Sequence, residues 1–306
     1  MSIADFKSRV GDTDTDGQHG SPLLVPPELF PSQDLTFLAR CGGLPPVVDH
    51  DDGDVHSTNL SLPRLIDSIA RSLYRRRSRH VLVTGQRGVG KTTLVWDLAQ
   101  RAATGEIAFL KDSRFLWVDT QDVPPDESRP RFAALLAFLA DCPDLILCLD
   151  GLGSLLRVEG CGTSKSLFRR ALKHPHRRII GVLSQWDYDE LLASESEILD
   201  LCTRVDVPEP DEGAARKIVR QAALKMEANF GCRISAEALE RSVSLSGRYI
   251  WNQCFPAKSI RVLERVCEDL DYERTQRTSE RTEVTHDDVI RVISDMSRVP
   301  DIAAGE

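Results

Sequence analysis

Eight consecutive residues form a motif that could hold phosphate groups. Residues 85–92 match the pattern G-x-x-x-x-G-K-[ST] at every position. Glycines let the backbone curl so that successive N–H groups face phosphate oxygens, and a following helix adds the positive end of its dipole. Lys91 can place its ammonium group on the β- and γ-phosphates, and the Thr92 hydroxyl can bind Mg²⁺. The motif predicts a nucleotide site made by Gly85, Gln86, Arg87, Gly88, Val89, Gly90, Lys91, Thr92 and Thr93.

The flanking segments have the patterns that would position such a loop. Residues 80–84 indicate a buried strand, and residues 93–100 carry apolar side chains three and four positions apart, as in a helix. A chance glycine-rich turn is the alternative, and this strand–loop–helix context disfavours it. Four more strands are predicted, separated by helical stretches, at residues 114–119, 145–150, 178–184 and 205–207. This alternation predicts an α/β fold of the P-loop NTPase type, with a doubly wound parallel sheet.

The pattern becomes helical after residue 212 and predicts a small C-terminal α-helical lid domain. Four helices are expected, at residues 213–228, 235–246, 258–273 and 285–296. Thr285 lies three residues before Asp288, which is typical of a helix start. The predicted organisation is an irregular, acidic and proline-rich arm over residues 1–57, a nucleotide-binding domain over 58–207, the lid over 208–300 and a tail over 301–306.

Composition narrows the class of protein. The net charge is −8, so no global basic field favours nucleic acid. The eight cysteines form no C-x-x-C pair, which indicates reduced thiols rather than a disulfide framework or a zinc site. No apolar stretch reaches the roughly 18 residues that would span a bilayer. We therefore expect a cytoplasmic protein with no membrane partner.

Three short stretches resemble the AAA+ ATPase family, and in particular the first nucleotide-binding domain of Clp-type chaperones. They are residues 98–107 after the phosphate loop, residues 205–210 at a domain junction, and a lid motif made by residues 247–250 with 255–260. The resemblance covers roughly residues 58–275. It implies an AAA+ domain and lid that bind ATP and Mg²⁺, with Asp150 orienting the metal through water.

The resemblance also implies two further nucleotide contacts. Ser184 lies at the end of the fourth predicted strand, where the family has a polar residue near the γ-phosphate, and Lys258 matches a lid lysine. An ordinary strand-ending serine and a solvated lysine at a helix start are the alternatives.

The family residues that cleave ATP are replaced in this chain. The family has Glu, the general base, directly after the strand that ends in Asp, whereas here Asp150 is followed by Gly151. The arginine-finger positions correspond to Asp200 and Leu201, and Arg204 falls where the family usually has a lysine. A positioned base contributes about 10²- to 10⁴-fold, and an arginine finger about 10³- to 10⁵-fold. The sequence therefore leaves the catalytic residues unknown and predicts weak or absent hydrolysis.

Four weaker patterns each have a simpler explanation. Residues 12–17 copy half of a calcium loop, and residues 49–56 hold two histidines among four aspartates, but solvated acidic segments are the better interpretation. The arginines between residues 71 and 79 could contact nucleic acid, but they are also typical of an exposed helix end. Acidic residues within 186–190 could be catalytic, although a helix start explains them.

Three functional hypotheses follow. The first is a Clp-like AAA+ module that binds ATP and Mg²⁺, hydrolyses ATP weakly or not at all, and uses nucleotide to control assembly with a protein partner, including self-association into a ring. The second is an active ATPase subunit of a Clp-type chaperone or unfoldase. Residues 120–131 contain no aromatic residue of the kind that grips substrate in this family, which disfavours threading. The third is a DNA-associated AAA+ ATPase, although nucleic acid is not an expected partner of an acidic chain.

Overall fold

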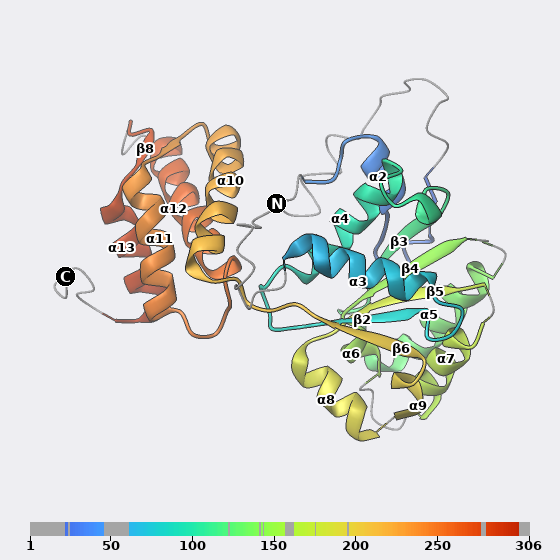
Figure 1. The fold of residues 1–306 in the computed structure, drawn as a ribbon. Coiled ribbons are helices and arrows are strands. Elements are labelled where there is room, and N and C mark those ends of the chain that lie inside the picture. The colour runs from blue at the N-terminus through green and yellow to red at the C-terminus, as the bar shows by residue number, and fades with distance from the viewer. Residues whose placement is uncertain are drawn as a thin grey trace.

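The computed structural model places an α/β domain beside a helical lid (Figure 1). It describes residues 22–23, 25–45, 61–121, 123–140, 142, 144–156, 162–174, 176–194, 196–276 and 280–299. The acidic runs at residues 12–17 and 49–56 lie outside the described residues. No helix in the described part of the chain is both long and apolar enough to cross a bilayer.

A six-stranded sheet forms the centre of the α/β domain. Its strand order is β1-β3-β4-β5-β2-β6, and every neighbouring pair is parallel except β1 with β3. The central strands are short, almost wholly apolar runs with both faces buried, as parallel sheets require. Their bounds are β1 Ser32–Asp34, β2 His80–Thr84, β3 Arg114–Asp119, β4 Leu145–Asp150, β5 Arg178–Val182 and β6 Cys202–Asp206.

Helices cover both faces of this sheet, which confirms the predicted doubly wound P-loop fold (Figure 1). One face packs against α2 Leu35–Arg40, α3 Leu62–Tyr74 and α4 Lys91–Ala103, with the short helix η1 Ala108–Leu110 after them. The other face packs against α5 Pro125–Phe138, α6 Leu152–Leu156, α7 Gly162–Leu172, α8 Gln185–Ser194 and α9 Ser196–Leu199. Parallel strands with two covered faces bring the loops at their carboxyl ends to one edge, where ligands bind in such folds.

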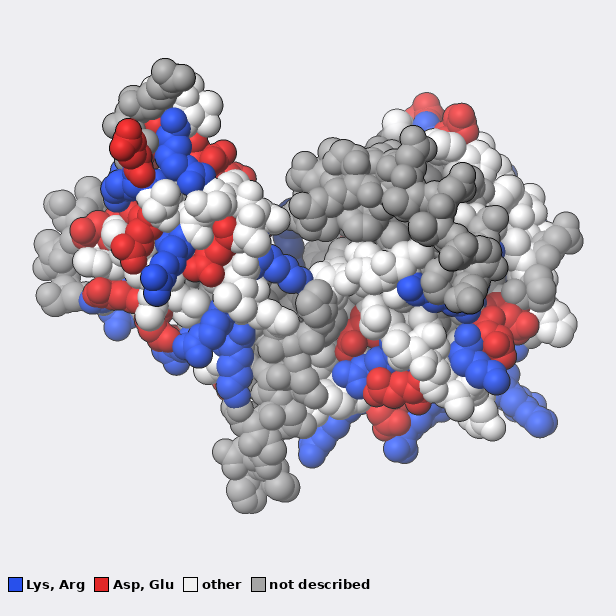
Figure 2. Space-filling view, turned by 90° about the horizontal axis from the view of Figure 1, so that it is seen from above, with Lys and Arg blue, Asp and Glu red and all other residues white. Residues whose placement is uncertain are grey.

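The lid has its own hydrophobic core and follows an extended connecting segment, residues 207–211 (Figure 1). Its helices are α10 Glu212–Phe230, α11 Ala236–Tyr249, α12 Ala257–Thr275 and α13 His286–Ser297, joined by the two-stranded sheet of β7 Arg233–Ile234 and β8 Glu283–Val284. The predicted start of α13 is a capping box between Thr285 and Asp288. Acidic and basic side chains are mixed over the lid surface (Figure 2), as in the ion pairs of Arg216 with Glu212 and Glu240.

The expectation of an irregular N-terminal arm is wrong for residues 32–40. Residues 32–34 form β1, which pairs antiparallel with β3, and α2 follows directly. The Asp34 side chain caps α2 by accepting from the Phe37 N–H, and it also pairs with Arg114 on β3. Leu35 is fully buried in the core. A three-residue strand and a six-residue helix are shorter than the windows in which periodicity can be detected, so the sequence pattern missed both.

The segment that connects β3 to the next helix is short. Pro124 and Pro125 do not delay that helix, because α5 begins at Pro125. Proline is tolerated in the first helical turn, because the N–H that it lacks has no partner there. The connection from β3 to α5 therefore covers only residues 120–124, and residues 125–131 are helical rather than part of a loop.

His80, at the start of β2, is a buried and neutral hydrogen-bonding group. Its Nε2 lies 2.7 Å from the Leu172 carbonyl oxygen, and its Nδ1 accepts from the Ile179 N–H at 3.1 Å. An imidazole that accepts at Nδ1 and donates at Nε2 carries no charge. Burial, together with nearby Arg79, lowers the pKa of His80 from 6.5 to about 4, against the opposing effect of the Leu172 carbonyl.

This geometry makes folding stability depend on pH. The unfolded chain binds a proton at His80 below about pH 6.5, whereas the folded chain resists protonation until about pH 4. The stability from His80 is complete above pH 6.5 and is lost as the pH falls towards 4, by up to about 3 kcal/mol. Urea unfolding at pH 7.5, 5.5 and 4.5 measures this loss. Relative to the wild type, the His80→Gln variant should gain stability as the pH falls from 7.5 to 4.5, because it lacks the contribution that the wild type loses at His80. An unchanged difference in unfolding free energy between the two proteins over this range would contradict the assignment.

Candidate nucleotide-binding site

The phosphate loop connects β2 to α4 at the carboxyl edge of the sheet. Gly85, Gly88 and Gly90 have positive φ angles of 147°, 93° and 100°, a backbone that side-chain-bearing residues rarely adopt. Gly90 directly precedes α4, so the N–H groups of the first helical turn face the concave side of the loop. The local sequence thus builds an anion cradle from backbone amides.

Lys91 lies folded onto the loop. Its Nζ donates to the carbonyl oxygens of Gly85 at 2.8 Å and Gln86 at 2.7 Å. Burial lowers the pKa of Lys91, and neighbouring acidic groups, Asp150 foremost, oppose that effect. The ammonium group is therefore held at the loop by two weak acceptors, which a phosphate oxygen could replace.

Two carboxylates lie side by side at the ends of β3 and β4. Asp119 and Asp150 are register partners in this parallel pair. Burial, and secondarily Asp119, raise the pKa of Asp150 to about 6, although the Gly151 N–H and Lys91 act in the opposite direction. A cation at this position would relieve the repulsion between the two carboxylates. The donor set of carboxylate oxygens and the Thr92 hydroxyl suits Mg²⁺, so these residues fit the predicted metal.

Gly151, at the predicted position of the general base, is packed against Gln121. Its φ is 71°, and a Cβ built there would lie 2.2 Å from Cγ of Gln121 and 3.3 Å from its Cβ. Gln121 follows β3 and its N–H donates to the Asp119 carboxylate at 3.0 Å. The site therefore holds a glutamine side chain over the glycine. Pattern analysis missed Gln121, because only the register of β3 with β4 brings it to this point.

The lid and the connecting segment directly contact the phosphate loop. A Cβ on Gly85 would lie 2.6 Å from the Val207 carbonyl oxygen, and one on Gly88 would lie 2.7 Å from Cβ of Ala257. The Cys254 N–H donates to the Arg87 carbonyl oxygen at 3.3 Å, and its thiol donates to Oε1 of Gln86 at 2.8 Å. Burial, with Glu209 nearby, raises the pKa of Cys254 to about 11, which keeps it a thiol donor. The phosphate loop is thus enclosed by the connecting segment at Val207 and by the lid at Cys254 and Ala257. Both of these parts are far from the loop in the sequence.

Comparison with known proteins agrees with this architecture. Family models described as "AAA domain" and "AAA lid domain" match residues 56–176 and 211–299. Chaperone protein ClpB of Yersinia enterocolitica is 30% identical over 76% of this chain and 26% of its own length, and ClpB of Leptolyngbya boryana is 28% identical over 82% and 29%. An S. cerevisiae Hsp104–ADP complex superposes with a TM-score of 0.74 at 20% identity, over 90% of this chain and 46% of that one.

The chain belongs to the AAA+ family and resembles its Clp-type chaperones. It spans between a quarter and a third of the length of these ClpB relatives. The predicted resemblance is thereby confirmed.

Ser184 of this AAA+ domain caps a helix. Its Oγ donates to the Asp187 carboxylate at 2.5 Å and accepts from the Asp187 N–H at 3.1 Å, so the two residues form a reciprocal cap at the start of α8. Lys258, at the start of α12, has a side chain only 9% exposed. Its Nζ lies 3.4 Å from Glu209 and 3.8 Å from the centre of the Phe255 ring. Lys258 follows Ala257, which lies against Gly88 of the loop, and the contact of Ser184 and Lys258 with nucleotide stays a prediction.

The arginine-finger positions carry no cationic side chain. Asp200 is exposed, and Leu201 packs against the core beneath α9. Arg204, on the edge strand β6, is held within the domain: its Nε donates to Thr84 Oγ1 at 3.1 Å, its Nη2 donates to Gln185 Oε1 at 2.8 Å, and its guanidinium lies 4.4 Å from the Tyr188 ring centre. Arg204 therefore tethers β6 to the end of β2 and to α8.

Because the lid lies so close to the phosphate loop, adding a methyl group to the loop at Gly88 should displace the lid. Gly88→Ala would force Ala257 and the lid away from the loop, whereas Gly90→Ala has nothing within 4 Å and carries a similarly unfavourable positive φ. We expect Gly88→Ala to raise the rate of proteolysis within residues 207–211 several-fold over Gly90→Ala, without nucleotide. Equal rates in the two variants would show that the lid does not rest on this loop.

Proposed function

We propose that the chain binds ATP with Mg²⁺ and hydrolyses it slowly or not at all, so that bound nucleotide sets the position of the lid and thereby controls a protein–protein contact. The single observation that carries the proposal is the enclosure of the phosphate loop by Val207, Cys254 and Ala257. A ligand bound in this loop would therefore affect the positions of both the connecting segment and the lid.

Each residue then has a defined task in holding the nucleotide. The loop amides and the first turn of α4 would bind the phosphates, and Lys91 would exchange its two carbonyl acceptors for phosphate oxygens. Thr92 and Asp150 would hold Mg²⁺, which when bound neutralises phosphate charge. Gly151 offers no group that could accept a proton from water. Gln121 covers that position with an amide, which is not a base at neutral pH.

The proposed organisation follows the contacts of the chain. We propose the boundary between the AAA+ domain and the lid at residues 207 and 208, supported by the change there from sheet to helical core. We also propose self-association or a separate protein partner as the output of lid movement. We place the protein in the cytoplasm, in keeping with the seven free cysteines among the described residues.

The decisive experiment measures binding, turnover and assembly on one preparation. Calorimetry with ATP and Mg²⁺ should give a dissociation constant between micromolar and millimolar. Turnover should lie well below the usual enzymatic range of about 1 to 10³ s⁻¹. Light scattering after size exclusion should show a nucleotide-dependent change in molecular mass. Absence of ATP binding would end the proposal, and absence of a mass change would remove the assembly function.

An active chaperone subunit is the second candidate, and the family relationship to proteins named ClpB favours it. In that case a base and an arginine would come from another chain. Steady-state turnover in the enzymatic range that disappears in the Lys91→Ala variant would support this function over the first.

A further inference from the structure

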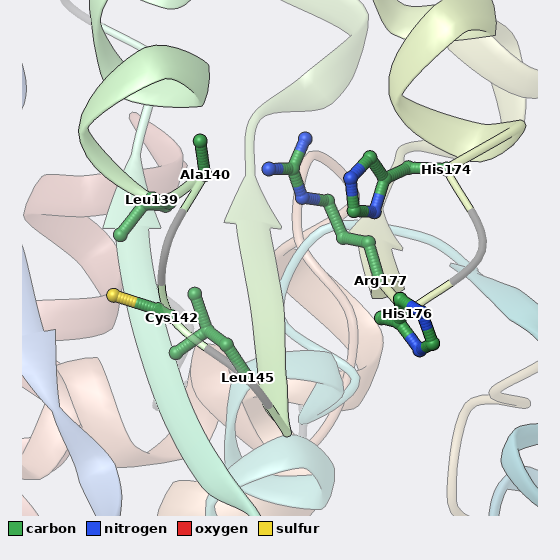
Figure 3. A pocket seen from close by; sticks show the side chains of 7 residues that line it. All are labelled: Leu139, Ala140, Cys142, Leu145, His174, His176 and Arg177. Carbon is green, nitrogen blue, oxygen red and sulfur yellow. The ribbon is translucent and has the colours of Figure 1, made fainter.

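We propose that a second ligand site lies at the opposite edge of the sheet, and that it takes a small organic anion with a carboxylate or phosphate head and a short apolar body. A cavity of about 260 Å³ opens there. Figure 3 shows its seven lining residues, which come from the end of α5, the start of β4 and the turn before β5. These are the amino ends of the parallel strands, so the cavity is separate from the phosphate loop.

Arg177 is the residue that points to an anion. It is only 8% exposed, and its guanidinium reaches into the cavity beside His174 (Figure 3). Of its five N–H donors, one has an acceptor among the described residues, the Leu136 carbonyl oxygen at the long distance of 3.4 Å. No carboxylate in the described part of the chain forms an ion pair with it. A buried charge without a counterion is costly, and a bound anion would supply the missing partner.

The described residues that line the cavity around Arg177 are two histidines, a cysteine and three apolar side chains, and none is a carboxylate. His174 and His176 flank it, with ring centres 6.4 Å apart, and Arg79 donates to the His174 carbonyl oxygen at 2.9 Å. Nδ1 of His174 is buried without a hydrogen-bond partner among the described residues. Burial, with Arg177, His176 and Arg79, lowers the pKa of His174. An anion in the cavity would therefore be met by a guanidinium and by two imidazoles able to donate.

The remaining walls define the rest of the ligand. Leu139, Ala140, Cys142 and Leu145 form the side of the cavity opposite the histidines (Figure 3). These side chains offer apolar contact to a body of a few carbon atoms. The combination of one cationic end and one apolar end favours an amphipathic anion over a bare ion.

Two probes at constant ionic strength test the proposal in the full-length chain: sodium butyrate and inorganic phosphate. The readout is the ¹⁵N resonances of the His174 and His176 rings, titrated to 50 mM probe. We expect saturable shifts with millimolar dissociation constants. The Lys91→Ala background excludes phosphate bound by the nucleotide loop, so that loss of ATP binding and loss of this site can be told apart.

The variants distinguish the pocket from general charge effects. Arg177→Met should weaken probe binding at least tenfold, and its melting temperature should not fall, because an unpaired buried charge is removed. Arg71→Met is the matched control, since Arg71 is exposed and, among the residues that the structure describes, its ion pair is with Asp67 in α3. If Arg177→Met does not fold, Ala140→Leu narrows the cavity and should reduce butyrate binding instead.

Each result of the probe titrations leads to a different conclusion. Saturation by butyrate alone assigns a carboxylate head, saturation by phosphate alone assigns a phosphate head, and either one supports the site if Arg177→Met abolishes it. Two results would overturn it: no saturable shift with either probe in the wild-type chain, or binding to Arg177→Met within twofold of wild type.

Discussion

Replacing Lys91 by alanine is expected to weaken ATP binding by about 30-fold to a few thousand-fold. This range follows from the roughly 2–5 kcal/mol that is lost when one partner of a buried, hydrogen-bonded charge pair is truncated. The Lys91 side chain is already held at the loop by the carbonyl oxygens of Gly85 and Gln86. Isothermal titration calorimetry with ATP and Mg²⁺ measures the change.

The control for this prediction is Lys111→Ala, which removes the same charge from an exposed position after η1. Its ATP affinity should equal that of the wild type. Circular dichroism should show that Lys91→Ala keeps the fold, since no core side chain changes. ATP affinity of Lys91→Ala within threefold of wild type would show that the nucleotide, if it binds, lies elsewhere.

Restoring the missing base should produce the second large effect, provided that space is made for it. A glutamate at residue 151 alone would collide with Gln121, whose Cγ lies 2.2 Å from the position of the new Cβ. The double variant Gly151→Glu with Gln121→Ala removes that obstacle. A positioned general base contributes about 10²- to 10⁴-fold. Because the predicted arginine-finger positions hold Asp200 and Leu201, we expect the lower end of that range.

The matched control keeps the shape and removes the base. Gly151→Gln with Gln121→Ala has a side chain of the same size and the same backbone strain at φ 71°, but no group that accepts a proton. Turnover by phosphate release should rise only in the glutamate variant. A rise in both, or in neither while ATP still binds, would show that Gly151 is not what limits hydrolysis.

Much of the fold follows from local sequence. The strands at residues 80–84, 114–119 and 145–150 have the predicted bounds, because runs of three to five consecutive apolar residues between polar ones are typical of buried strands. The lid helices begin and end within about three residues of their predicted limits, since each has a clear apolar stripe. Elements too short for periodicity, β1 and α2, were not predictable in this way.

The candidate site, too, is only partly predictable from local sequence. The phosphate loop is a contiguous motif, so its residues could be named from sequence. The Gln121–Gly151 contact and the Cys254–Gln86 hydrogen bond join residues 30 and 168 positions apart in the chain. No local pattern encodes such pairs, because they depend on strand register and on how the lid lies against the loop.

The antiparallel strand β1 covers the edge of the sheet at β3. Without residues 32–34, the outer row of N–H and C=O groups of β3 would be free to pair with an extended segment of another molecule. Those groups belong to a largely apolar strand, and exposed apolar strand edges favour aggregation. The segment ahead of the phosphate loop therefore protects solubility, and recombinant versions of this domain need to start upstream of Ser32.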